Sequence, residues 1–199
     1  MNVDPDDLSR RDAYQLMIGA ITPRPIAWIS TRSMGGGLNL APFSFFNGVT
    51  SDPMIISVAI GTRRGEHKDT FTNIVDMEEF VVNVVEERHA NAMVATSADY
   101  PPEVSEFEAV GIETEPSETV RVPRVKGAPI ALECHFERLL TVGHGPTHLI
   151  LGRVLNVHVR DDLLDADGRI DPSRFTAVGR LGQQLYCAVR EAIEIERPR

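Results

Sequence analysis

The sequence has few of the features that are typical of secreted proteins, membrane-spanning proteins or proteins stabilised by a structural metal. Its 199 residues contain only two cysteines, Cys134 and Cys187, which lie far apart in separate apolar runs. This pattern favours buried thiols in a reducing compartment over a disulfide framework. The N-terminus has no apolar segment after a basic start, and no apolar run approaches the ~18 residues that span a bilayer. We therefore expect a cytoplasmic protein that is not bound to membranes.

Positive charge is also scarce. The chain has 20 Lys and Arg against 29 Asp and Glu, a formal net charge of −9. Nucleic acid is excluded as a partner, because long phosphate tracks require broad basic surfaces. Yet residues 61–70 bring Arg63, Arg64, His67 and Lys68 together beside two threonines. Cations concentrated in one short loop of an acidic protein predict a site for one small anion.

The order of apolar segments predicts a mainly β domain covering residues 1–199. Five runs have the composition or alternation of strands, at residues 25–31, 54–60, 80–85, 130–137 and 148–159. A short helix capped by Asp69 or Thr70 is expected to run to residue 76, and a second to span residues 87–98. Residues 103–118 are expected to be loop with short extended pieces. Strands that do not alternate regularly with helices favour an antiparallel barrel or sandwich.

Residues 39–50 are the most informative segment. They place small hydroxyl and amide side chains between aromatic rings, which suits a flat ligand with polar edges. The predicted helix nearby would bring free backbone N–H groups to the same anion. From these residues alone two other interpretations stay open, because Phe43, Phe45 and Phe46 also suit a plain core and a charged loop is often only solvated.

Other kinds of site are not supported by the sequence. His144 and His148 are four residues apart, but Gly145 and Pro146 exclude the helix that a metal pair would need. The glycines at 35–37 lack the spacing of a dinucleotide fold, and no phosphate-binding P-loop is present. We therefore expect no bound metal, and we expect any nicotinamide nucleotide to bind only transiently.

Several motifs in order resemble one family. Residues 23–31, 39–47, 51–53, 63–70, 123–125, 132–134 and 178–186 are similar to motifs of the flavin reductase-like, FMN-binding split-barrel family, in particular its flavoredoxin-type branch. The resemblance covers roughly residues 13–190. It implies a six-stranded antiparallel Greek-key split barrel with flanking short α-helices, a homodimer, and FMN bound near the subunit interface.

The resemblance also implies roles for individual residues. His148 would lie on the nicotinamide side of the flavin as a catalytic or substrate-binding residue. Gln183 stands where related sequences often have glycine, so the last loop is expected to differ. The expected FMN-binding residues are Asn39, Ala41, Pro42, Ser44, Phe45, Asn47, Val49 and Thr50 along the ring and its chain, Arg63, Lys68, Asp69 and Thr70 at the phosphate, and Arg180 at the C-terminal side.

Two functions compete at this point. The first is an NAD(P)H-dependent flavin reductase, which transfers hydride from NADH or NADPH to FMN and keeps the flavin or releases it to a partner monooxygenase. The second is a flavoredoxin-like electron carrier reduced by a basic redox protein, which would dock on the acidic residues 99–118. A homologue that binds no flavin stays a third possibility, because fold does not fix function.

Overall fold

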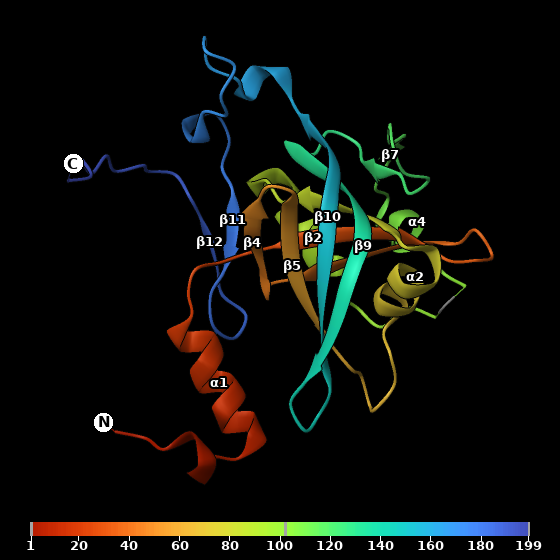
Figure 1. Ribbon diagram of the computed structural model, residues 1–199, viewed down its shortest axis with the longest axis vertical. Coiled ribbons are helices and arrows are strands. Elements are labelled where there is room, and N and C mark those ends of the chain that lie inside the picture. The colour runs from red at the N-terminus through yellow and green to blue at the C-terminus, as the bar shows by residue number, and fades with distance from the viewer. Residues whose placement is uncertain (1, 102, 199) are drawn as a thin grey trace.

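The computed structural model describes residues 2–101 and 103–198 and is built around one antiparallel sheet (Figure 1). Within these residues the sheet has seven strands in the order β3-β2-β6-β9-β10-β5-β4. The mainly β class is confirmed, with one strand more than the six expected. The bounds are β2 (Ala27–Arg32), β3 (Leu38–Phe43), β4 (Phe46–Ser51), β5 (Met54–Gly61), β6 (Glu79–Val84), β9 (Ile130–Val142) and β10 (Thr147–Val159).

The segment 39–50, for which the sequence predicted no strand, contributes to two strands, β3 and β4. Only Ser44 and Phe45 separate β3 from β4, although these strands lie at opposite ends of the sheet order. The chain therefore turns at Ser44 and brings the two ends of the sheet together, with Phe45 O accepting a hydrogen bond from Ala59 N of β5 at 2.8 Å. This corner is where a curved sheet becomes a barrel.

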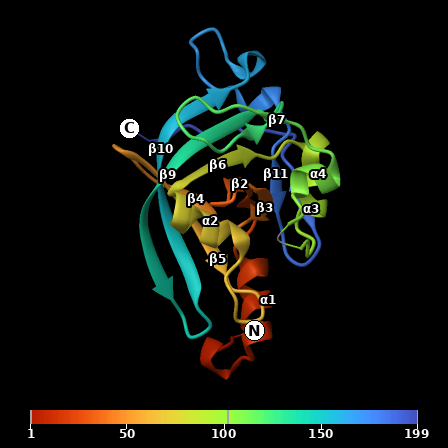
Figure 2. The same cartoon turned by 90° about the vertical axis from the view of Figure 1, so that its right-hand side faces the viewer.

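Short elements flank the barrel. Strands β1 (Arg24–Pro25), β11 (Val178–Arg180) and β12 (Tyr186–Ala188) form one small sheet, and β7 (Thr114–Glu115) pairs with β8 (Arg124–Val125). Helix α2 (Asp69–Met77) packs against β2, β3 and β6, whereas α1 (Arg10–Ala20) extends away from the sheet (Figures 1 and 2). Helices α3 (Ala90–Ala95) and α4 (Glu106–Val110) contact β3.

Three helical expectations need correction. The helix expected over residues 87–98 is a 3-10 turn (Glu87–His89) followed by α3. The segment 103–118, expected to be loop, contains the five-residue helix α4, which ends at Gly111 in the left-handed conformation (φ 71). Helix α1 was not predicted, although Ser9 caps it by accepting a hydrogen bond from Asp12 N at 3.1 Å.

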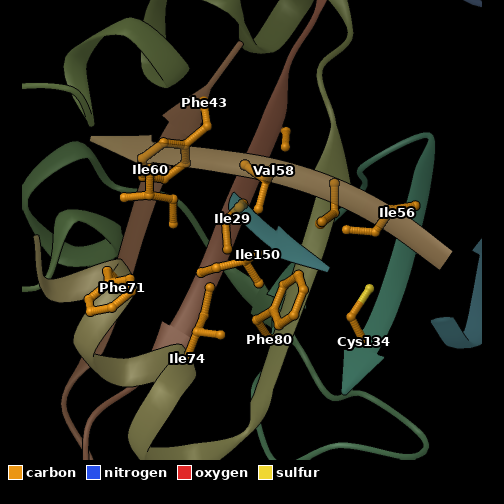
Figure 3. Close-up of a cluster of buried hydrophobic side chains, with 12 residues drawn as sticks. Ile29, Phe43, Ile56, Val58, Ile60, Phe71, Ile74, Phe80, Cys134 and Ile150 are labelled. Atoms are coloured by element: carbon orange, nitrogen blue, oxygen red, sulfur yellow. The ribbon is translucent and has the colours of Figure 1, made fainter. Parts of the chain in front are cut away.

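The core fills the barrel between β2, β5, β6, β10 and α2 (Figure 3). Ile29, Val58 and Ile150 are fully buried there. Gly152 lets β10 pass the ring of Phe80, since a Cβ at this position would lie 2.4 Å from Phe80 Cζ. Cys134 is buried in the same cluster, and burial raises the pKa of its thiol, as expected for an unreactive cysteine. Cys187 is only half-buried, contrary to expectation.

A buried carboxylate ties the loop at 117–122 to the sheet. Glu133 of β9 is fully buried and accepts hydrogen bonds from Glu118 N at 2.8 Å and Thr119 N at 2.6 Å. The Thr119 hydroxyl and His158 also bond to it. Burial alone would raise the pKa of Glu133, but these hydrogen bonds outweigh burial and lower it to about 2.

Candidate functional site

A tight turn presents the arginines of the predicted anion loop. Arg63 and Glu66 exchange two backbone hydrogen bonds of 2.9 and 2.8 Å, which closes a turn with Arg64 and Gly65 at its tip. Both tip residues have positive φ, 50° for Arg64 and 87° for Gly65. Glycine adopts this conformation freely, whereas Arg64 is strained in it. The strained conformation of Arg64 indicates that the surrounding structure, and not only the local sequence, fixes the shape of this turn.

Helix α2 begins directly behind this turn. Its N-cap is Lys68, and no side chain among the described residues caps it, so the N–H groups of Asp69 and Thr70 stay free to bind an acceptor, whereas Phe71 N donates to Lys68 O at 2.9 Å. The prediction that Asp69 or Thr70 would be the cap is therefore wrong, because both already lie inside the helix. Lys68 Nζ lies 5.3 Å from the centroid of the Phe43 ring. Burial, and then the charge of Arg63, lowers the pKa of Lys68.

A buried polar network fixes the start of α2 to the sheet. The Asn39 amide of β3 accepts a hydrogen bond from the Thr70 hydroxyl at 3.0 Å and donates to Glu106 Oε1 at 3.2 Å, and Asn73 donates to the Thr31 hydroxyl at 3.0 Å. The Glu106 carboxylate accepts from Leu40 N at 2.9 Å, and burial raises the pKa of this group. Since Thr70 is 1% exposed, its hydroxyl supports the site from behind.

Three cavities meet at Pro42 and Phe43, which line all of them. The loop cavity, about 270 Å³, is bounded by residues 63–70 and 96–100 and by Asn39, Ala41 and Glu106. The helix cavity, about 550 Å³, lies between α1 and the Ser44 corner. The C-terminal cavity, about 210 Å³, lies between the same corner and Arg180. Together they form a divided slot along residues 42–45.

One face of α1 forms a wall of the helix cavity. Arg10, Ala13, Tyr14 and Met17 share that face, and the Tyr14 ring centroid lies 6.4 Å from that of Phe45. The Arg10 guanidinium packs on Gly145 in the β9–β10 turn, where a Cβ would approach it to 2.4 Å. Among the described residues, Arg10 and Lys68 line this cavity and no carboxylate does.

Arg24 joins the pieces around the C-terminal cavity. It is 5% exposed and donates to the carbonyls of Ile18 at 2.6 Å, Ile21 at 2.5 Å and Leu181 at 2.8 Å. Its Nε lies 3.4 Å from the Ser44 hydroxyl. One buried cation thus connects the end of α1, the barrel corner and the loop after β11.

Arg180 closes this cavity from the side that the sequence predicted. Its guanidinium bonds to the Tyr186 hydroxyl and the Gln183 carbonyl, and burial lowers its pKa. Gln183 has φ 54, in the region that glycine prefers, so the loop keeps a left-handed turn without a glycine.

The structure brings most of the predicted residues together. Ten of them line the three cavities, namely Asn39, Ala41, Pro42, Ser44, Phe45, Arg63, Lys68, Asp69, Thr70 and Arg180. Asn47, Val49 and Thr50 instead lie exposed on β4, outside these cavities. Their contact with a flavin stays a prediction.

His148 lies behind the loop cavity. It is 6% exposed, its ring stacks on Phe71 at 4.2 Å, and His67 covers it with centroids 4.9 Å apart. Its Nδ1 lies 3.3 Å from the Thr141 hydroxyl, and its buried Nε2 has no partner among the described residues. Burial, and then His67, lowers the pKa of His148. Contact with a nicotinamide would require His67 to move and stays a prediction.

The cavity residues that sequence reasoning missed include Arg10, Tyr14, Arg24 and Asp99. Arg24 could have been recognised from the sequence. It stands at the start of an apolar strand, and an arginine buried there needs polar partners. The residues of α1 could not be recognised in this way, since their position depends on how the helix leaves the barrel.

The described residues contain neither a metal-ligand cluster nor a membrane-spanning helix. No group of three or more His, Cys, Asp or Glu side chains is placed to hold a metal ion. Across residues 2–101 and 103–198, no helix has the length and apolar character needed to cross a membrane.

Comparison with known proteins identifies the family. Residues 19–174 match the model of the flavin reductase like domain. Nitrilotriacetate monooxygenase component B from Bacillus cereus is 36% identical, with a TM-score of 0.94 over 98% of both chains. The 2-nitrobenzoate 2-nitroreductase NbaA from Pseudomonas fluorescens is 34% identical, with a TM-score of 0.91 over 100% of this chain and 96% of that one.

A third structure shares the fold. This protein of Shewanella frigidimarina, described as a flavin reductase with a split barrel domain, is 22% identical with a TM-score of 0.87 over 100% of both chains. At this identity the likeness concerns the fold alone, and it confirms the split-barrel architecture. The chain belongs to the flavin reductase like domain family, and the class of protein it represents is a flavin-binding oxidoreductase.

Proposed function

We propose that this protein is an NAD(P)H-dependent flavin reductase that uses FMN. The observation that carries the proposal is the arrangement at the loop cavity. Arg63, Lys68 and the free N–H groups of α2 meet at one end of a slot whose wall is formed by residues 42–45. A dianionic phosphate fits the cationic end, and a flat ring fits the slot beside it.

The residues present fit FMN. Arg63 and Lys68 would bind the phosphate, and the buried bond between Asn39 and Thr70 would keep the start of α2 in place behind it. The Ser44 hydroxyl, held near Arg24, is available to the polar edge of the ring. The redox chemistry is supplied by the flavin when bound, which takes a hydride from a reduced nicotinamide and gives electrons to an acceptor. The protein itself would bind and orient the flavin and exclude water from the site.

The helix cavity supports a nicotinamide donor. Within the slot, the helix cavity meets the loop cavity at Pro42 and Phe43. It offers the rings of Tyr14 and Phe45 to a second planar group. Arg10 and Lys68 give it positive charge, which suits the phosphates of NADH or NADPH.

Two similar proteins suggest different electron acceptors. One is component B of a monooxygenase, which supports reduced flavin being passed to a partner monooxygenase. The other is a nitroreductase, which supports a small aromatic acceptor bound in the same slot. The helix cavity, with a volume of about 550 Å³, is large enough for a small aromatic molecule, which supports nitroreduction as a second candidate function.

A protein-reduced electron carrier has less support. Of the acids in residues 99–118 that were expected to form a docking patch, Glu106 is buried, and Asp99, Glu113 and Glu115 pair with basic side chains. A basic partner would meet fewer unpaired charges than the sequence indicated. A homodimer is part of the proposal, and β4, the last strand in the sheet order, in which Val49 is 56% exposed, supplies an exposed edge for a second copy.

Rapid anaerobic mixing tests the proposed reaction. The protein is loaded with FMN and mixed with NADH or NADPH, and the loss of visible flavin absorbance is followed in time. Reduction by either nucleotide, faster than that of free FMN, is the expected result. If FMN binds but neither nucleotide reduces it faster than in free solution, the reductase proposal is wrong and a protein donor is favoured. A nitroaromatic added to the reduced protein then tests the second acceptor.

A further inference from the structure

An ion pair spans the loop cavity where the phosphate of the proposed flavin would bind. The Arg63 guanidinium bonds directly to the carboxylate of Asp99, and Arg64 Nη2 lies 3.9 Å from the same group. The two sides come from different segments, residues 63–70 and 96–100, and both line the cavity. Within the described chain, Asp99 is the acidic partner of Arg63.

Both partners are held in place by the fold. The segment that carries Asp99 is anchored at Thr96, whose hydroxyl accepts from the buried Trp28 Nε1 at 2.9 Å and donates to Met93 O at 2.8 Å. Arg63 is held by its two backbone bonds to Glu66. The fold therefore fixes the backbone on both sides of the cavity and keeps the two charges within reach of each other.

We propose that Asp99 is an affinity-determining residue that takes the place of the flavin phosphate at Arg63 and so keeps FMN exchangeable. This inference rests on the proposed function. A phosphate must displace the Asp99 carboxylate before Arg63 can bind it, and the displaced carboxylate then faces a second anion. Both effects weaken the binding of phosphate-bearing flavins, whereas riboflavin, which lacks the phosphate, escapes them.

The exposure of the pair makes displacement feasible. The side chains of Arg63 and Asp99 are 45% and 57% exposed, and an ion pair so open to solvent contributes little to stability. A phosphate gains more, because it accepts charge-assisted bonds from Arg63 and Lys68 together. Arg64, whose Nη2 lies 3.9 Å from the Asp99 carboxylate, offers Asp99 an alternative partner after the exchange. The flavin is then a substrate that enters and leaves.

Replacing the carboxylate tests the inference with a gain of affinity, which damage to the fold would not produce. FMN and riboflavin are titrated into wild type, Asp99→Asn and Glu66→Gln by following flavin fluorescence. Glu66 is a matched control, since it lines the same cavity and makes no ion pair among the described residues. We expect Asp99→Asn to lower the FMN Kd about two- to fivefold, the range of an exposed ion pair, and to leave riboflavin unchanged.

The pairing itself is tested in an Arg63→Gln background, where Asp99→Asn should tighten FMN binding less than it does in the wild type, and an equal gain in both backgrounds would overturn the pairing. Unchanged or weaker FMN binding by Asp99→Asn, or an equal gain with Glu66→Gln, would overturn the inference while leaving the proposed function intact. A wild-type protein that binds no FMN would instead overturn the proposed function, and this inference with it.

Discussion

Removing the charge of Lys68 is the sharpest perturbation of the proposed phosphate site. Lys68 stands at the N-cap of α2 with its Nζ over the Phe43 ring, so Lys68→Met keeps an apolar stem on that ring and removes only the cation. A hydrogen bond to a charged group contributes about 1.5–3 kcal/mol, which corresponds to a Kd for FMN that is about 10- to 150-fold higher. Riboflavin has no phosphate and should bind as before.

The assay is an equilibrium titration of both flavins, with Lys126→Met as the matched control. Lys126 is an exposed lysine that pairs with Glu113 and lies outside the three cavities, so its loss should leave both affinities unchanged. An equal loss for FMN and riboflavin would show that Lys68 supports the ring or the fold. An unchanged FMN affinity would refute the assignment of the phosphate to this end of the slot.

Three further outcomes are expected. Thr70→Val removes one hydrogen-bond partner of the buried Asn39 amide and should lower the free energy of unfolding by about 1–3 kcal/mol, measured by urea denaturation; an unchanged value would contradict the network. Because the folded-state pKa of Glu133 is lowered from 4.5 to about 2, its stabilisation is present above pH 4.5 and is lost as the pH falls toward 2. Between pH 6 and pH 3 the wild type should lose about 2 kcal/mol more than Glu133→Gln, and parallel losses would refute this. Val49→Glu should shift the proposed dimer toward monomer in light scattering, whereas an unaltered mass would exclude β4 from the interface.

The strands were predictable because their patterns are local. The run at 54–60 lies between Pro53 and Gly61, and the strand found there, β5, differs by one residue at its end. The corner at Ser44 was not predictable, since it depends on closure of the sheet between β3 and β5, which are distant in the sheet order. Helix α4 was missed because a five-residue helix shows too little periodicity to separate it from loop.

The site divides in the same way. Arg63 and Lys68 could be predicted to bind an anion, because cations concentrated in one loop of an acidic chain indicate an anion-binding site. The sequence could not show that Asp99, 36 residues after Arg63, pairs with it across the cavity. Nor could it show that His67 and Phe71 cover His148, since that arrangement depends on how α2 sits against β10.

The central claim is that the phosphate of FMN binds where Arg63, Lys68 and the start of α2 meet. A crystal structure of the protein with FMN tests it most directly. The account predicts the phosphate within hydrogen-bonding distance of Arg63 and Lys68, with the ring along residues 42–45 and Asp99 turned away from Arg63. A phosphate found elsewhere, with the loop cavity closed by the Arg63–Asp99 pair, would contradict it.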